Sequence, residues 1–311
     1  MLAVKLANDD RTFHNLKMTK TAWVFPGQGS QSLGMGMDLL ELPLAKKKFA
    51  QAEEILGWSV IEICQNDGEK LSRTLYTQPC LYVVESILAD LLLEKEQPHL
   101  VAGHSLGEYL ALYVAGVFDW TCGLKLVQRR AQLMDSAAGG MMAALMNFDP
   151  EKLEKVIAAT SDVVVANDNS PAQVVISGTP AAVETVISQV NAKRAVPLKV
   201  SGAFHSPFMA AAAAELEKIL ESVKFNTAKI PVLSNVEPTA CVEADILKQR
   251  LKQQMTGKVR WREICLALPE YGIERVVEVG PANVLTGLIK RSCSKLILEN
   301  IRTSADLLAL K

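Results

Sequence analysis

A serine flanked by glycines stands where a short apolar segment gives way to a helical pattern. Residues 103–107 read GHSLG, which matches the G-x-S-x-G pattern of a nucleophile elbow. The glycines allow a sharp turn at little steric cost, and backbone N–H groups at the start of the helix would stabilise negative charge developing beside Ser105. The pattern predicts a nucleophilic serine. The alternative is a simple strand–turn–helix joint in which the serine caps the helix.

A serine hydroxyl needs a base, and the chain has four histidines. His14 lies in the N-terminal segment, His99 begins the strand before the turn, and His104 is expected to diverge from Ser105 around the turn. His205 lies in the loop SGAFHSPFM at a predicted domain junction, where a side chain can reach over a cleft. We therefore predict His205 as the base, the alternative being an ordinary loop histidine. No Asp or Glu stands out as a third member, so a backbone carbonyl could orient the imidazole.

Hydrophobic periodicity and caps predict an α/β fold around these residues. Strands are expected at the start of 21–31 and at 99–103, 230–235, 275–279 and 295–300, and helices at 36–56, 79–96, 106–117, 121–137, 207–222, 244–255, 261–271 and 283–291.

A second pattern interrupts this alternation. Its order is strand 141–147, helix 149–160, strands 162–168 and 173–178, helix 179–193 and strand 195–201, which is the βαββαβ order of a ferredoxin-like module. The predicted domains are a disordered N-terminal tail (1–19), a large α/β domain (20–140 and 205–311) and a ferredoxin-like small domain (141–204).

Composition excludes several classes of protein. The chain has 311 residues, 49% of them hydrophobic, and a net charge of −1, which argues against a nucleic-acid partner. Its six cysteines are scattered singly, so we expect reduced thiols in the cytoplasm and no disulfide framework or zinc site. No apolar run approaches the roughly 20 residues of a membrane span, and residues 1–19 lack the apolar core of a signal peptide. No metal or cofactor site is expected.

Six ordered motifs carry a resemblance to a known family. FPGQGSQ, GHSLGEY, QRRAQLM, NSPAQVVISG, GAFHSPFM and EVGPANVLTGL together resemble malonyl-CoA:acyl-carrier-protein transacylases and the acyltransferase domains of fatty-acid and polyketide synthases. The resemblance runs from about residue 20 to the C-terminus. It implies an α/β-hydrolase-like parallel-sheet core with an inserted ferredoxin-like domain.

The resemblance also implies a reaction and its site. Malonyl-CoA would acylate Ser105 with His205 as base, and the phosphopantetheine thiol of acyl carrier protein would then take the malonyl group, in a ping-pong reaction that supplies fatty-acid biosynthesis without a cofactor. The implied oxyanion donors are the backbone N–H groups of Gln28 and Leu106. The implied ligand of the substrate carboxylate is Arg130, whose planar guanidinium grips a carboxylate with two parallel hydrogen bonds.

Further roles follow from the resemblance. Gln254 corresponds to the glutamine whose backbone carbonyl holds the histidine, with Gln253 as the alternative. Phe204 favours malonyl over methylmalonyl, and Asn169, with Asn167, could touch substrate or simply form an Asx turn.

The carrier protein, acidic in this family, is expected to meet a basic rim on an enzyme that acts as a monomer. The candidates are Lys193 with Arg194, Lys258 with Arg260 and Arg262, and Lys290 with Arg291. Three alternatives remain: a trans-acting polyketide acyltransferase, a serine esterase or thioesterase, and an inert carrier-docking scaffold. The catalytic set argues against a scaffold, and Arg130 argues against a general esterase.

Overall fold

The computed structural model describes residues 19–137 and 139–310, so residues 1–18 of the predicted tail, including His14, lie outside the described residues. The larger of two sheets has five parallel strands in the order β7-β2-β1-β8-β9. Their bounds are β1 (Thr21–Phe25), β2 (Leu100–Gly103), β7 (Val232–Leu233), β8 (Arg275–Val279) and β9 (Ile297–Ile301).

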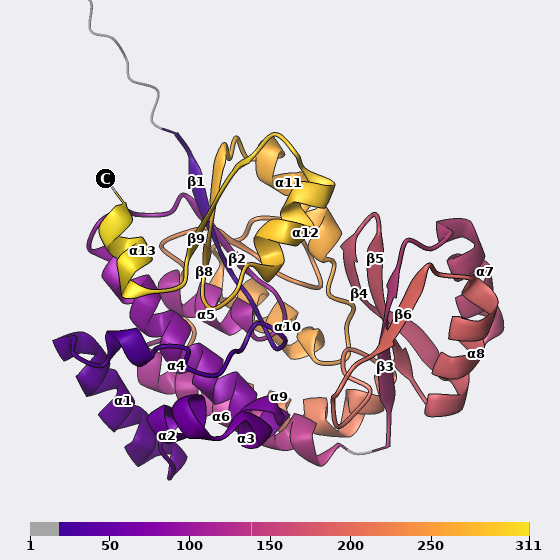
Figure 1. Ribbon diagram of the computed structural model, residues 1–311, viewed down its shortest axis with the longest axis horizontal. Helices are drawn as coiled ribbons and strands as arrows, with labels where there is room; N and C mark the ends of the chain where they lie inside the picture. The colour runs from indigo at the N-terminus through magenta and orange to yellow at the C-terminus, as the bar shows by residue number, and fades with distance from the viewer. Residues whose placement is uncertain (1–18, 138, 311) are drawn as a thin grey trace, which may run out of the picture.

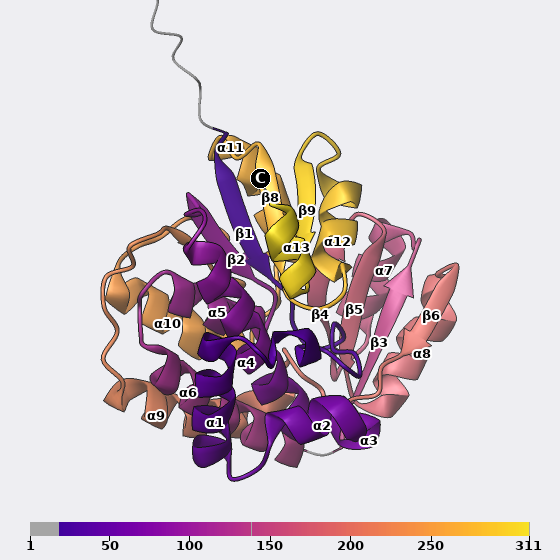
Figure 2. The same ribbon diagram turned by 60° about the vertical axis from the view of Figure 1, so that its left-hand side comes forward.

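Helices cover both faces of this sheet (Figures 1 and 2). Side chains alternate along β1, so that Trp23 and Phe25 join one hydrophobic core while Ala22 and Val24 join another. The first core is built with α1 (Pro43–Leu56), α2 (Val60–Asn66), α3 (Gly68–Ser72), α4 (Thr74–Leu93), α5 (Gly107–Val114), α6 (Trp120–Ser136), α9 (Ala210–Ser222), α10 (Ala244–Gln254) and α13 (Ser304–Ala309). The second is built with α11 (Trp261–Glu270) and α12 (Val284–Ser292).

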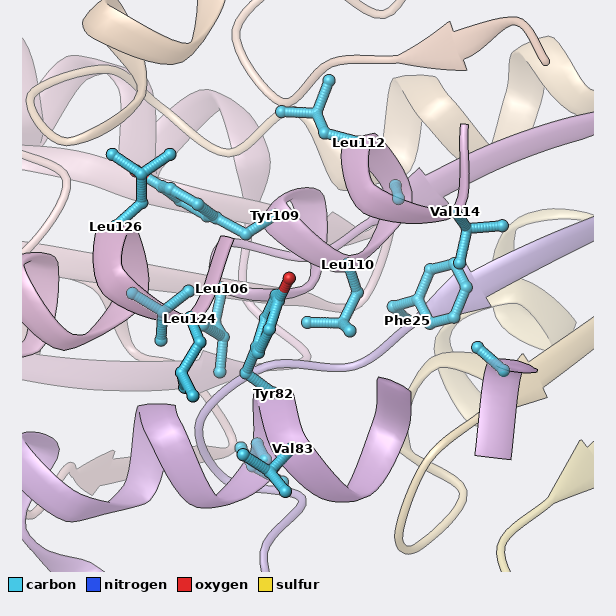
Figure 3. Packing of buried hydrophobic residues seen from close by; sticks show 14 of the residues in the cluster. Phe25, Tyr82, Val83, Leu106, Tyr109, Leu110, Leu112, Val114, Leu124 and Leu126 are labelled. Atoms are coloured by element: carbon cyan, nitrogen blue, oxygen red, sulfur yellow. The ribbon is translucent and has the colours of Figure 1, made fainter. Parts of the chain in front are cut away.

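The first core surrounds the helix that follows the predicted elbow. Figure 3 shows Leu110 of α5 beside Tyr82 of α4, with Leu124 of α6 packed nearby. Seven of the eight residues of α5 are buried, so this helix is covered by its neighbours almost all round. The turn at its N-terminus is therefore held by tertiary packing as well as by its own sequence.

The smaller sheet is antiparallel, in the order β4-β5-β3-β6. Its strands are β3 (Met141–Met146), β4 (Val163–Ser170), β5 (Gln173–Gly178) and β6 (Arg194–Pro197). Helices α7 (Pro150–Ala159) and α8 (Pro180–Val190) pack on one face, and each begins with proline after a capping residue, Asp149 or Thr179. The α/β class and the ferredoxin-like arrangement are confirmed.

Several predicted elements were wrong in extent. The helix predicted over 36–56 is a short 3-10 turn, η1 (Met37–Leu39), followed by α1, because a proline fits the first helical turn better than a helix interior. The helix predicted over 79–96 begins earlier, at Thr74, and keeps Pro79 inside it, where burial among neighbouring helices outweighs the lost hydrogen bond. Helices α2, α3 and α13 were not predicted, and the strand predicted over 230–235 shrinks to β7.

One glycine of the elbow is fixed by a close approach of two chain segments. A Cβ placed on Gly107 would lie 2.0 Å from the carbonyl oxygen of Phe25, at the end of β1. Backbone at that distance cannot move aside as a flexible side chain could, so only glycine allows β1 and the start of α5 to meet.

We expect Gly107→Ala to lower the free energy of unfolding by about 3 kcal/mol or more, because the added methyl group overpacks rigid backbone. The measurement is urea unfolding followed by circular dichroism. The matched control is Gly287→Ala in α12, where an added Cβ meets open space. This control should gain about 0.5–1 kcal/mol. Equal stability of the two variants would contradict the prediction.

Candidate active site

Ser105 follows the carboxyl end of β2 and precedes α5, as the elbow pattern predicts. Its φ is 53°, in the left-handed region that residues other than glycine rarely occupy. The N-cap of α5 is Leu106, and no side chain caps the helix. The alternative of a serine that caps the helix is therefore wrong. The strained backbone conformation belongs to Ser105, whose hydroxyl does not bond to the N-terminus of α5.

His205 lies beside Ser105 although 100 residues separate them. Its Nε2 is 2.8 Å from Ser105 Oγ. Its Nδ1 is 2.9 Å from the carbonyl oxygen of Gln254 and 3.2 Å from that of Gly257. Carbonyl oxygens only accept hydrogen bonds, so the ring proton belongs on Nδ1, and the lone pair of Nε2 faces the serine hydroxyl.

Arg130, on α6, completes the contacts of the serine hydroxyl. Its Nη2 donates to Ser105 Oγ at 3.0 Å, its Nη1 donates to Gln78 Oε1 at 2.7 Å, and its side chain is buried. Burial and the neighbouring Arg130 cation together lower the pKa of His205 to about 3. At neutral pH His205 is therefore uncharged and able to accept a proton.

Adjacent arginines on α6 face different surroundings. Arg129 donates to the Gln132 side chain at the surface, whereas Arg130 makes no ion pair within the described part of the chain. The guanidinium of Arg130 lies 5.5 Å from the Tyr109 ring, and its Nε meets no acceptor among the described residues. The buried Glu108 side chain lies on the far side of Gln254 and acts on Arg130 only through space. A buried cation with no carboxylate in direct contact is costly, so an anionic ligand that contacts Arg130 would stabilise it.

Gln254 contacts three of the predicted residues at once. Besides its backbone contact with His205, its Oε1 accepts from Arg130 at 3.1 Å, and its Nε2 donates to the Ser105 carbonyl at 2.9 Å. The same Nε2 donates to Glu108 Oε2 at 2.7 Å. Burial raises the pKa of Glu108.

A glycine-rich loop closes the site from the side of β1. A Cβ on Gly27 would lie 2.5 Å from the His104 carbonyl oxygen and 3.6 Å from the Leu106 nitrogen, so the loop touches the elbow. The side chain of Gln28 is tied to Thr74 of α4 by a hydrogen bond of 3.1 Å. Within the described residues, the backbone N–H groups of Gln28 and Leu106 donate to no protein acceptor. Two donors are thus available beside Ser105.

These residues line a narrow cavity of about 80 Å³. Its polar residues include Gln28, Gln78, Ser105, Arg130 and His205, and its apolar wall is Met134, Met142, Leu198, Val200 and Phe204.

The structure separates the two asparagines near the cavity. Asn167 lines it, whereas the Asn169 Oδ1 lies 2.8 Å from His104 Nε2. His104 stays close to the site instead of diverging fully, since it also lines the cavity while its ring packs on Trp261.

Sequence reasoning missed Gln78, Glu108 and Asn235, all of which are buried around the elbow. Glu108 lies in the helix predicted over 106–117, but a polar residue on a helix carries no sign of which way it faces. Gln78 lies one residue before the helix predicted over 79–96, because α4 begins earlier than the sequence indicates. Asn235 ends a predicted strand, and strand ends are where functional side chains gather in parallel sheets. Its position at a strand end was the one sequence signal that could have identified Asn235.

No group of three or more side chains suited to hold a metal ion occurs in 19–137 and 139–310. All six cysteines are free. No described helix is long and apolar enough to cross a membrane.

The sequence matches the acyl transferase domain family over residues 22–306. The chain therefore belongs to this family of acyltransferases.

Two curated relatives cover most of the chain. A malonyl CoA-acyl carrier protein transacylase of Synechocystis sp. is 59% identical over 94% of this chain and 100% of its own length. Its crystal structure superimposes with a TM-score of 0.93. A polyketide-biosynthesis malonyl CoA-acyl carrier protein transacylase of Bacillus subtilis is 42% identical over 86% of this chain and 96% of its own.

One similar solved structure is a complex. It holds a malonyl-transacylase with its type II PKS acyl-carrier protein, and it matches with a TM-score of 0.89 at 37% identity over 93% of this chain and 98% of that one.

We expect His205 to stay neutral down to about pH 5, because its folded-state pKa of about 3 lies below the ordinary value. The measurement is an NMR titration of histidine side chains, with the His205 signal assigned from a His205→Gln variant. Arg130→Met should raise this pKa, since it removes the repelling cation. Titration of wild-type His205 near pH 6.5 would contradict the prediction.

Proposed function

We propose that this chain transfers the malonyl group from malonyl-CoA to acyl carrier protein through a malonyl ester on Ser105. The observation that carries the proposal is the buried guanidinium of Arg130, which contacts no carboxylate directly among the described residues and lies 3.0 Å from Ser105 Oγ. A malonyl group bears a carboxylate at the end opposite its thioester, so a thioester presented to Ser105 brings that carboxylate toward Arg130.

In the first half-reaction, His205 Nε2 accepts the hydroxyl proton as Ser105 Oγ attacks the thioester carbonyl. The negative charge that develops on the carbonyl oxygen is stabilised by the N–H groups of Gln28 and Leu106. The intermediate collapses with cleavage of the carbon–sulfur bond, and the proton on His205 passes to the departing CoA sulfur. The products are a malonyl-serine ester and free CoA.

The second half-reaction reverses these roles with a different thiol. His205 accepts the proton of the phosphopantetheine thiol, whose sulfur attacks the malonyl-serine carbonyl. The same two N–H groups stabilise the charge, and the proton then returns to Ser105 Oγ as the ester breaks. The backbone carbonyl of Gln254 holds His205 in the required tautomer throughout.

Acyl selectivity follows from the size and charge of the cavity. Its small volume favours a short acyl group, and Arg130 favours one with a terminal carboxylate. Phe204 occupies the wall where a branched acyl group would need room. Asn169 acts on His104 in this proposal and not on the substrate, because its side chain is turned to that ring.

The pathway, assembly and location are part of the same proposal. The 59% identity to the Synechocystis transacylase favours fatty-acid biosynthesis, and the 42% identity to the polyketide enzyme makes a polyketide carrier the second candidate. One chain supplies every residue of the proposed site, which supports a monomer. The free cysteines support a reducing compartment, the cytoplasm.

Among the basic clusters of the expected carrier-docking rim, some cations are already engaged. Arg260 pairs with Glu263 and Arg262 with Asp168, which leaves Lys193 with Arg194, Lys258, and Lys290 with Arg291 as the better candidates to meet an acidic carrier.

We expect Ser105→Ala to abolish both the acyl-enzyme and malonyl transfer, since no other nucleophilic side chain in 19–137 and 139–310 contacts His205. The measurement is the intact mass of the protein after mixing with malonyl-CoA. Wild type should gain one malonyl group, and addition of holo-carrier should discharge it. Rapid release of free malonate without an adduct would favour the hydrolase alternative.

Arg130→Ala should lower malonyl transfer by at least about 30-fold, because a substrate carboxylate loses its buried partner. Acetyl transfer, which needs no carboxylate ligand, should fall much less. Arg129→Ala is the matched control and should leave both rates near wild type. Equal losses for the two acyl groups in Arg130→Ala would refute the carboxylate role.

A further inference from the structure

The backbone of Ser105 requires an external restraint. Its left-handed φ of 53° is a conformation that a serine leaves readily unless surrounding groups hold it. The hydroxyl contacts His205 and Arg130, but hydroxyl contacts leave the peptide groups on either side free to rotate. The restraint has to come from groups that bind the backbone around the turn.

Asn235 binds that backbone on both sides of His104. Its Oδ1 accepts from the Ser105 N–H at 2.7 Å, and its Nδ2 donates to the Gly103 carbonyl at 2.6 Å. The topology explains the placement: Asn235 follows β7, which is parallel to β2, so the carboxyl ends of both strands meet at the same edge of the sheet. One side-chain amide thus bridges the last residue of β2 and the nucleophile.

The orientation of this amide is itself fixed. The backbone N–H of Asn235 donates to Glu108 Oε2 at 3.2 Å, and its carbonyl accepts from the Arg260 N–H at 2.9 Å. Its side chain is fully buried. Rotation of the amide by 180° would set a donor against the Ser105 N–H and an acceptor against the Gly103 carbonyl, so the observed assignment is the one the partners allow.

We infer that Asn235 is a positioning residue that holds Ser105 in its strained conformation for nucleophilic attack. By engaging the Ser105 N–H, it also leaves the N–H groups of Gln28 and Leu106 as the two donors facing the cavity. Asn235 does not line that cavity, so it acts through Ser105 and not on the acyl group. The inference rests on the proposed function only in naming Ser105 as the nucleophile.

The test compares Asn235→Asp and Asn235→Ser with the matched control Asn226→Ala, which removes an asparagine bonded to the Val117 backbone away from the site. Asp keeps the shape and the Oδ1 acceptor but sets an acceptor against the Gly103 carbonyl. Ser adds no charge and is too short to span both groups.

Two rates are measured on protein that shows a cooperative unfolding transition: labelling of Ser105 by a fluorophosphonate, and malonyl transfer. Both Asn235 variants should lose about 10- to 100-fold in labelling rate and in kcat, while KM changes by less than about threefold. Asn226→Ala should match wild type in both measurements.

A wild-type labelling rate in either Asn235 variant would overturn the inference. So would failure of both variants to fold, which would make Asn235 a structural residue. Failure of the proposed function has a different signature: wild type would take the fluorophosphonate on Ser105 yet form no malonyl adduct, and the Asn235 comparison would still be decided by labelling.

Discussion

The site depends on burying one guanidinium beside a neutral histidine, with no carboxylate of the described residues in direct contact with it. Arg130 is fully enclosed, yet its hydrogen-bond partners among the described residues are neutral: Gln78, Gln254 and the hydroxyl of Ser105. The buried Glu108 side chain acts on it only at longer range. Removal from water makes the charge of Arg130 act strongly over short distances. Together with the burial of His205, which is the larger cause, this charge lowers the pKa of that histidine and keeps its imidazole neutral. The same charge makes the cavity attractive to an acyl group that brings its own carboxylate. The buried charge of Arg130 thus contributes both to the neutral state of the base and to the selection of a substrate that carries a carboxylate.

The fold allows that burial because segments far apart in the sequence bring their side chains into contact around Ser105. The β2–α5 turn supplies Ser105, α6 supplies Arg130, the turn before η2 (Pro207–Met209) supplies His205, and the end of α10 supplies Gln254. Gln254 then joins them: its one side chain accepts from Arg130 and donates to the Ser105 carbonyl, while its backbone holds His205. A displacement of Gln254 would therefore disturb the contacts of all three residues at once.

The sequence predicted those features that depend on local pattern. The elbow, the small-domain strands and both capped helices of that domain have distinctive turns, caps and periodicity, and His205 emerged from only four histidines. Glu108 was missed because helix periodicity does not reveal which polar residue turns inward among other helices. Gln78 was missed because it precedes the helix predicted over 79–96, whereas α4 begins at Thr74. Asn235 was missed because its function depends on β7 lying beside β2, a non-local pairing. The contact of Asn169 with His104 likewise joins two sheets and has no local signature.

The absence of a carboxylate beside His205 among the described residues fits the charge of the site. A carboxylate at Nδ1 would stabilise the imidazolium and raise its pKa, but it would also offer Arg130 a competing anion inside the same enclosed space. Two backbone carbonyls fix the tautomer equally well without a formal charge. No carboxylate of the described residues then contacts Arg130 directly, so its guanidinium stays available to an incoming carboxylate. The site must bind a carboxylate that arrives with the substrate. For that reason His205 has neutral partners at Nδ1, and Arg130 has no carboxylate in direct contact among the described residues.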